Sequence, residues 1–232
     1  MKILSTGNEE IDSNLGGGLP VPSLMLIEGD HGSGKTAIIA LLMKGMLDGE
    51  MRVLYFTENT VTDYIKKMKS ITFDFTVPFL KDKMKILSMH VDGTTWSKHQ
   101  SSTLLSKVGQ YIAVNDKKID CVAIDSLSLL TLYASQESIM DFITKCRNLV
   151  SQGMTIILTI QPNSIPQELN SSLKSASDVY LALSSSNIGS QAVKVMKTVK
   201  MIGSKALAES SFAFNVDPIF GIKSVPISMA TV

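Results

Sequence analysis

A glycine-rich segment near the start of the chain constrains its fold more than any other feature. Residues 29–36 read GDHGSGKT and fit the pattern G-x-x-x-x-G-K-[ST] of a phosphate-binding loop. The apolar run 23–28 before the loop predicts a buried strand, and residues 36–43 after it favour a helix. In this order, strand, loop and helix direct backbone N–H groups and the positive end of the helix at phosphate oxygens. The segment therefore predicts a binding site for a nucleoside triphosphate.

The residues of this loop have distinct expected roles. Lys35 is placed to reach the β- and γ-phosphates, and the Thr36 hydroxyl is placed to hold Mg²⁺. Ahead of the loop, the glycine run 16–18 is expected to let the chain pass close to the strand 23–28. The sequence shows no pattern that would recognise the nucleobase, so it does not distinguish ATP from GTP as the ligand. The expected nucleotide-binding residues are Gly29, Asp30, His31, Gly32, Ser33, Gly34, Lys35, Thr36 and Ala37.

The rest of the chain predicts an α/β fold. Further strands are expected at 51–57, 85–89, 120–126 and 154–160. Helices are expected at 9–15, 62–70, 101–114 and 136–152. Their alternation predicts a mostly parallel central sheet flanked by helices on both faces. With 232 residues, the chain is expected to form a single nucleotide-binding domain over residues 1–232.

After Pro162 the sequence no longer shows the regular alternation of strands and helices. Residues 163–177 predict a Ser- and Asn-rich loop or loose helix. Closely spaced strands then predict an antiparallel C-terminal extension of the sheet, at 178–183, 192–201, 211–216 and 222–227.

Composition excludes several classes of protein. The net charge is +1, from 22 basic and 21 acidic residues, so no overall field favours nucleic acid or anionic lipid. No apolar run approaches the ~20 residues that span a bilayer, and the N-terminus lacks the regions of a signal peptide. Cys121 and Cys146 lie in apolar contexts and are expected to be reduced core thiols of a cytoplasmic protein. With no clustered Cys/His spacing, no transition-metal site is expected.

Polar residues end three of the expected strands, at the edge where parallel sheets collect ligands. Asp125 is expected to complete a Mg²⁺ site opposite Thr36, although it could be an ordinary strand-ending aspartate in a turn. Glu58 is a candidate general base, or an acid complementing the helix 62–70. Gln161 is a candidate sensor of the γ-phosphate, or a polar residue bonded to backbone.

Taken together, the motifs resemble the KaiC/RadA branch of the RecA-like P-loop NTPases. The resemblance rests on segments 5–7, 11–12 and 15–20 before the loop, and on 125–126, 200–204 and 220–222 after it. Within this branch the chain most resembles the FlaH family, ATP-binding accessory proteins of the archaellum (archaeal flagellum) motor. The resemblance implies a RecA-like fold that binds ATP with Mg²⁺. It also implies a cytoplasmic protein, peripherally associated with the membrane through the motor, that forms a homo-hexamer. The implied partners are the motor ATPase FlaI, a polytopic membrane platform protein and a ring scaffold.

The chain departs from its clock-type relatives at positions that matter for hydrolysis. These relatives carry two adjacent glutamates where this chain has Glu58 and Asn59. They also carry a Lys-x-Arg that reaches the nucleotide of the neighbouring subunit. Lys200 matches the lysine and is expected to act in trans, but Ile202 stands at the arginine position. Because an arginine finger contributes about 10³–10⁵ in turnover, hydrolysis is expected to be slow or absent.

Three functions compete on this basis. The first is a nucleotide-gated assembly component whose surface a motor partner reads. The second is an active KaiC-like ring ATPase or autokinase, for which Glu58 argues and against which Ile202 argues. The third is a RadA-like recombinase relative. The segment 163–177 would line the pore of such a ring, but it carries only Lys174 as a base, so no nucleic acid is expected.

Overall fold

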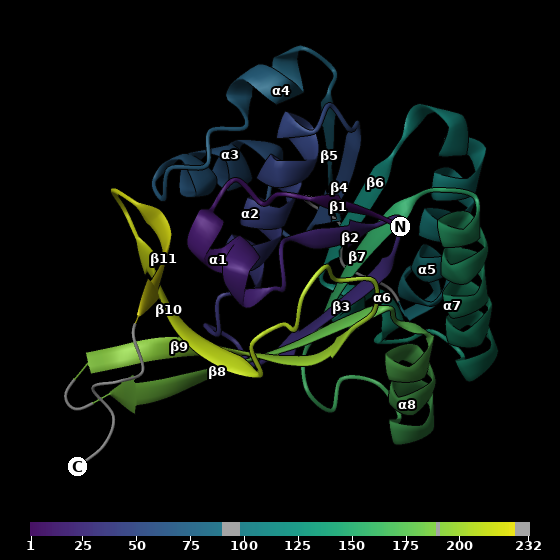
Figure 1. The fold of residues 1–232 in the computed structure, drawn as a ribbon. Coiled ribbons are helices and arrows are strands. Elements are labelled where there is room, and N and C mark those ends of the chain that lie inside the picture. The colour runs from purple at the N-terminus through teal and green to yellow at the C-terminus, as the bar shows by residue number, and fades with distance from the viewer. Residues whose placement is uncertain (90–97, 189–190, 226–232) are drawn as a thin grey trace.

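A nine-stranded sheet forms the centre of the protein, with helices on both faces (Figure 1). The computed structural model describes residues 1–89, 98–188 and 191–225. The strand order is β11-β10-β9-β8-β3-β7-β6-β4-β5. The mostly parallel α/β sheet and its antiparallel C-terminal strands are confirmed.

The parallel strands carry the phosphate-binding loop and its polar neighbours. These strands are β3 (Leu24–Gly29), β4 (Val53–Thr57), β5 (Met84–Ser88), β6 (Cys121–Asp125), β7 (Thr155–Ile160) and β8 (Val179–Ile188). Every residue of β3, β4, β6 and β7 is buried, because helices cover the sheet on both sides. Alternate residues of β3 enter opposite cores: Met25 and Ile27 face one, Leu24 and Leu26 the other.

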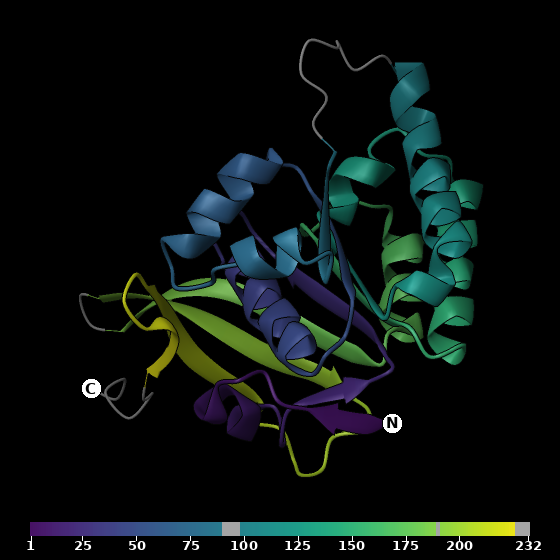
Figure 2. The same cartoon turned by 90° about the horizontal axis from the view of Figure 1, so that it is seen from above.

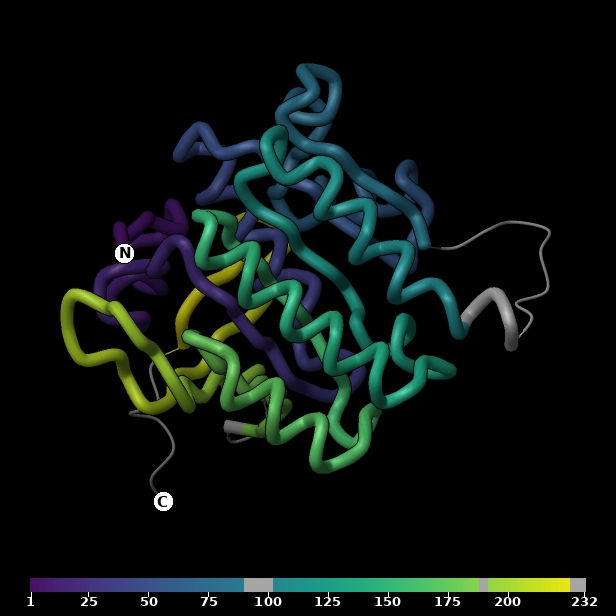
Figure 3. Tube along the Cα trace, turned by 90° about the vertical axis from the view of Figure 1, so that its right-hand side faces the viewer, coloured from purple at the N-terminus to yellow at the C-terminus, as the bar shows by residue number. Residues whose placement is uncertain are grey.

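One helical layer packs on each face of the sheet, as the views in Figures 2 and 3 show. The first face is covered by α1 (Glu9–Asn14), α2 (Lys35–Asp48), α3 (Val61–Lys69) and the short α4 (Thr76–Leu80). The second is covered by α5 (Lys98–Val114), α6 (Leu127–Thr131), α7 (Gln136–Ser151) and α8 (Gln167–Ala176). A single 3₁₀ turn, η1 (Asp116–Lys118), follows α5. The five-residue helices α4 and α6 were not predicted, because they are too short for a helical period to be read.

The C-terminal extension differs from the prediction at its first strand. β8 runs parallel to β3, whereas β9 (Gln191–Met201), β10 (Ser211–Asp217) and β11 (Gly221–Val225) are antiparallel. The physical reason is α8, which supplies the crossover that a parallel connection needs. Within the segment 163–177, predicted as a loop or loose helix, residues Gln167–Ala176 form helix α8. The antiparallel part of the sheet begins only at β9.

The N-terminal segment contacts the last described strand of the large sheet, β11. β1 (Lys2–Leu4) and β2 (Leu19–Val21) form a separate two-stranded sheet, which was not predicted. Asn8 Nδ2 donates to the carbonyl oxygen of Ile222 on β11 at 2.8 Å. The first and last described strands therefore lie against the same helical layer (Figure 1).

The glycine run 16–18 corrects one expectation. It packs against β1 and the loop after β9 rather than against β3. A Cβ on Gly18 would lie 2.5 Å from the carbonyl oxygen of Leu4, and one on Gly16 would lie 2.4 Å from that of Ala206. Both glycines have positive φ, +120° and +74°. The run thus allows a close approach of two backbones, but of different segments from those expected.

Within the described residues, none of the helices combines the length and the apolar character needed to cross a bilayer.

Candidate nucleotide-binding site

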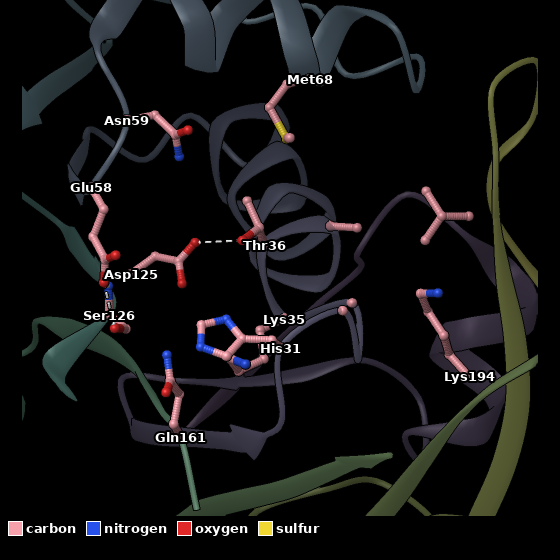
Figure 4. A pocket seen from close by; sticks show the side chains of 14 residues that line it. His31, Lys35, Thr36, Glu58, Asn59, Met68, Asp125, Ser126, Gln161 and Lys194 are labelled. Atoms are coloured by element: carbon pink, nitrogen blue, oxygen red, sulfur yellow. Dashed lines mark hydrogen bonds between the residues drawn. The ribbon is translucent and has the colours of Figure 1, made fainter. Parts of the chain in front are cut away.

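The carboxyl ends of β3, β4, β6 and β7 meet around one cavity of about 410 Å³ (Figure 4). This is the edge at which open parallel sheets bind ligands. The lining residues come from segments spread over most of the chain: His31, Gly32, Gly34, Lys35, Thr36, Ala37, Glu58, Asn59, Met68, Asp125, Ser126, Gln161, Lys194 and Val216.

The phosphate-binding loop connects β3 directly to α2. Gly34 is the residue before the helix and adopts a left-handed conformation, with φ of +96°. The Lys35 ammonium folds back over the loop and donates to the carbonyl oxygens of Gly29 at 2.6 Å and Asp30 at 2.8 Å. Burial lowers the pKa of Lys35, while the carboxylates of Asp125, Asp30 and Glu58 oppose that shift. The ammonium therefore sits where it can exchange carbonyl oxygens for phosphate oxygens.

The loop also contains an unsatisfied polar atom. Ser33 Oγ is buried and has no hydrogen-bond partner among the described residues. A buried hydroxyl without a partner costs about 1–3 kcal/mol, and Ser33 is not among the residues that line the cavity. Gly32 comes directly before Ser33, and a Cβ added to it would meet nothing within 4 Å. The open space beside Gly32, which does line the cavity, leaves room there for a phosphate group.

Asp125 is held in one orientation by three side chains. Its Oδ2 accepts hydrogen bonds from Thr36 Oγ1 at 2.7 Å and from the Tyr55 hydroxyl at 3.1 Å. Its Oδ1 accepts one from Thr159 Oγ1 at 2.8 Å. Figure 4 shows the contact between Thr36 and Asp125 as a dashed line. A carboxylate beside a hydroxyl is a donor set that suits Mg²⁺, which keeps its other positions for water and phosphate oxygens.

Tyr55 behind this carboxylate was missed by the sequence analysis. It lies on β4, is fully buried, and its ring centroid is 4.5 Å from that of Tyr64. Burial, followed by the charge of Asp125, raises the pKa of Tyr55 well above its ordinary value, so the hydroxyl remains a donor. Its sequence signal is faint: one polar-tipped side chain inside an apolar strand.

Glu58 lies beside Asp125, as its position after β4 predicts. Thr57 pairs with Asp125 in the sheet register, which brings the next residue to the cavity. Glu58 Oε1 accepts hydrogen bonds from Ser126 Oγ at 2.7 Å and from Ser126 N at 3.3 Å. The carboxylate is therefore bonded to the segment after β6, and the first turn of α3 is capped by another residue. Thr60 caps α3 instead, by accepting from Asp63 N.

Gln161 follows β7 and its side chain points into the cavity (Figure 4). Its backbone N–H donates to Ser128 Oγ at 2.9 Å, and its carbonyl oxygen accepts from Ser164 Oγ at 2.7 Å. The backbone bonds are therefore satisfied by serines, and the amide group is left to face the site.

Lys200 and Ile202 lie away from the cavity of their own chain. In the sheet register Lys200 pairs with Tyr180, which is level with Leu26 on β3, toward the edge opposite the phosphate loop. Lys200 Nζ donates to the carbonyl oxygen of Ser175 on α8 at 2.9 Å. The side chain of Ile202 is 48% exposed. Neither residue can reach the nucleotide site of the chain that carries it.

Lys174 is half-buried and is paired with a carboxylate of its own chain. Its Nζ lies 2.7 Å from Glu28 Oε2, next to the start of the phosphate loop, and the Tyr180 hydroxyl donates to the same carboxylate. Burial raises the pKa of Glu28, but the bonds from Lys174 and Tyr180 together outweigh it, and the pKa lies below its ordinary value. The single base expected in segment 163–177 thus ties α8 to β3.

Comparison with known proteins agrees with this geometry. A family model described as "ATPase: KaiC" matches residues 4–227. An archaeal flagellar ATP-binding protein FlaH from Sulfolobus acidocaldarius is 36% identical over 229 residues, covering 98% of this chain and 99% of that protein.

Two solved structures share the fold. The crystal structure of flagellar accessory protein FlaH from Methanocaldococcus jannaschii aligns with a TM-score of 0.87 and 20% identity, covering 97% of this chain and all of that one. A KaiC-like protein from Pyrococcus horikoshii aligns with a TM-score of 0.76 and 20% identity, covering 97% of this chain and 99% of that one.

Proposed function

The chain belongs to the KaiC family of RecA-like ATPases, and on that premise we propose that it is an ATP-binding accessory component of the archaellum motor. In this proposal ATP with Mg²⁺ occupies the cavity at the phosphate loop. Binding of the nucleotide, rather than its rapid hydrolysis, favours a conformation that a motor partner recognises. The relatives that carry the name FlaH over nearly the whole chain support the assignment to the archaellum.

The observation that carries the nucleotide part is the contact of Thr36 with Asp125. It joins the phosphate loop to the end of β6 at 2.7 Å, beside a lysine whose ammonium is already folded over the loop. Thr36 and Asp125 would hold the Mg²⁺, and Lys35 would bind the terminal phosphates. The metal would neutralise phosphate charge, and the chain's own groups would orient it.

Slow hydrolysis follows from the residues around the γ-phosphate. Glu58 is the candidate general base and Gln161 the candidate γ-phosphate sensor, and both line the cavity. The missing element is the arginine, since Ile202 stands in its place and cannot stabilise phosphoryl charge. Loss of about 10³–10⁵ in turnover would bring an ordinary ATPase rate of about 1–10³ s⁻¹ to a very slow one.

The partner assignments are part of the proposal. They comprise a homo-hexamer in which Lys200 approaches the neighbouring nucleotide, and contacts to FlaI, a polytopic membrane platform protein and a ring scaffold. This arrangement makes the protein cytoplasmic and peripherally associated with the membrane. Apolar side chains exposed near Lys200, those of Val199, Ile202 and Leu207, support a covered surface there. Nucleic acid remains outside the proposal, because Lys174 is paired with Glu28.

A second candidate is an active KaiC-like ring ATPase or autokinase. Glu58 favours it, because the carboxylate lies at the cavity beside Asp125, where it could activate a water molecule or a hydroxyl.

One experiment separates the two candidates. ATP affinity and phosphate release are measured for the wild type, Lys35→Ala, Glu58→Gln and Ile202→Arg. Lys44→Ala serves as the control, because Lys44 lies on the same helix α2 and pairs at the surface with Asp48. We expect ATP binding that is lost only in Lys35→Ala, and a wild-type turnover below about 10⁻² s⁻¹. Turnover of about 1 s⁻¹ or more that Glu58→Gln abolishes would favour the enzyme instead.

A further inference from the structure

A cation from the antiparallel extension faces the nucleotide cavity and has no role in the function proposed above. Lys194 lies on β9 and lines the cavity together with the phosphate loop. Figure 4 shows its side chain rising beside the loop, on the side away from Glu58, Asp125 and Gln161. The cavity therefore has two lysines, and they come from opposite halves of the chain.

The register of the sheet explains how a residue so distant in sequence reaches the loop. Gly29 at the end of β3 pairs with Leu183 of β8, and Leu183 pairs with Met196 of β9. Because β9 is antiparallel, Lys194 lies two residues beyond that level, opposite Ser185. At about 3.3 Å per residue it extends roughly 6–7 Å past the end of β3. That distance places it over the phosphate loop.

The stem of Lys194 packs on the loop itself. A Cβ added to Gly34 would lie 2.9 Å from Lys194 Cδ and 3.3 Å from the ring of Phe214, which is fully buried. The aliphatic carbons therefore rest on the Gly34 backbone, and the ammonium is carried past it. A lysine held this way loses conformational freedom, in contrast to a lysine that extends into solvent.

The ammonium itself has no partner in the described parts of the chain, where it makes neither an ion pair nor a hydrogen bond. The two carboxylates at the cavity are engaged elsewhere: Asp125 by Thr36 and Tyr55, and Glu58 by Ser126. Lys35 differs, since it donates to two carbonyl oxygens of the loop. Among the residues that the structure describes, Lys194 is thus a positioned charge beside the phosphate loop without a bonding partner.

The position of Lys194 in the cavity indicates which phosphate of a bound nucleotide it would contact. Thr36, Asp125 and Glu58 mark the end of the cavity that suits the metal and the terminal phosphate. Lys194 lies on the other side of the phosphate loop (Figure 4). The cavity lining also includes the apolar residues Ala37, Met68 and Val216, which suit the uncharged nucleoside. We infer that Lys194 binds the α-phosphate of the nucleotide, a group that ATP and ADP share. This inference depends on the proposed function, because it requires a nucleotide in the cavity.

The test compares ATP and ADP affinities by calorimetry for the wild type, Lys194→Met and Lys197→Met. Lys197 is the matched control: it lies on the same strand, is exposed, and points to the opposite face of the sheet. Loss of one charge-assisted contact should weaken ATP and ADP by about the same factor, roughly tenfold. Lys197→Met should leave both affinities within about twofold of the wild type.

Further variants keep the result decisive. Lys194→Arg retains the charge and should bind ATP within about threefold of the wild type. Lys194→Gln serves in place of Lys194→Met if thermal unfolding without nucleotide shows that the methionine variant is destabilised. Unchanged affinity in both neutral variants would overturn the inference, and so would weaker ATP binding with unchanged ADP binding, which indicates a γ-phosphate contact. If the wild type binds no nucleotide, the proposed function fails as well. If the wild type binds ATP and Lys35→Ala does not, the proposed nucleotide site stands. The Lys194 variants then test only the α-phosphate contact.

Discussion

Replacing Tyr55 with phenylalanine tests how Asp125 is held for a metal ion. The hydroxyl of Tyr55 donates to Asp125 Oδ2 at 3.1 Å from a fully buried position on β4. The substitution removes one oxygen atom and keeps the ring, which packs with its centroid 4.5 Å from that of Tyr64. The effect therefore reports on the hydrogen bond and not on packing.

The expected size of the effect follows from the charge on the acceptor. A hydrogen bond to a charged group stabilises a protein by about 1.5–3 kcal/mol, so we expect the free energy of unfolding to fall by about that amount. Residues that orient a metal ligand typically contribute 10–100-fold in metal affinity, so ATP binding should require roughly tenfold more Mg²⁺. Because burial raises the pKa of Tyr55 well above its ordinary value, the difference should stay constant between about pH 6 and pH 9.

Two measurements check this prediction: urea unfolding monitored by fluorescence, and ATP titrations over a series of Mg²⁺ concentrations. Tyr64→Phe is the control, since the buried Tyr64 hydroxyl has no hydrogen-bond partner among the described residues. Removing an unpaired hydroxyl should leave the Mg²⁺ requirement unchanged and the stability equal or slightly higher. Equal Mg²⁺ requirements in Tyr55→Phe and Tyr64→Phe would refute the reasoning.

Three further predictions concern other parts of the site and the core. Lys174→Met should destabilise the protein most at neutral pH, and the loss should shrink as the pH falls below 4.5, because the lowered pKa of Glu28 stabilises the fold only while that carboxylate is ionised. A loss that is constant with pH in urea unfolding would contradict this. Gly34→Ala should lower the free energy of unfolding by about 1–2 kcal/mol and weaken ATP binding, since alanine is strained at a φ of +96°; an unchanged thermal midpoint would argue against it. Cys121 and Cys146 should resist a thiol reagent until the protein is unfolded, because burial raises the pKa of each thiol to about 12; rapid labelling of the native protein would show otherwise.

Local sequence predicted the elements whose signals lie within a few residues. The phosphate loop, its flanking strand and helix, and the long amphipathic helices are visible because period and turn chemistry are properties of neighbouring residues. The residues at the strand ends were predicted as well. Glu58, Asp125 and Gln161 were expected at one edge of the sheet, and all three line the same cavity. That step succeeds because parallel strands place their carboxyl ends together.

Features that depend on residues far apart in the chain were harder to predict from the sequence. The direction of β8 depended on whether the segment before it forms a helix, and its Ser- and Asn-rich composition weakens that signal. The ion pair of Lys174 with Glu28 joins residues far apart in the chain. In the sequence, Lys174 is only a lone base in a polar segment, and nothing near it indicates a buried partner.

The sequence by itself determined that this chain has a P-loop within a mostly parallel α/β sheet, because a short contiguous motif and a regular alternation carry that information. It also determined the absence of an arginine at position 202. Only the tertiary structure decided that Tyr55 holds Asp125 and that Lys194 overlies the phosphate loop. Those contacts depend on strand order and register, which long-range packing sets, and a shift of one residue would turn either side chain to the other face of the sheet.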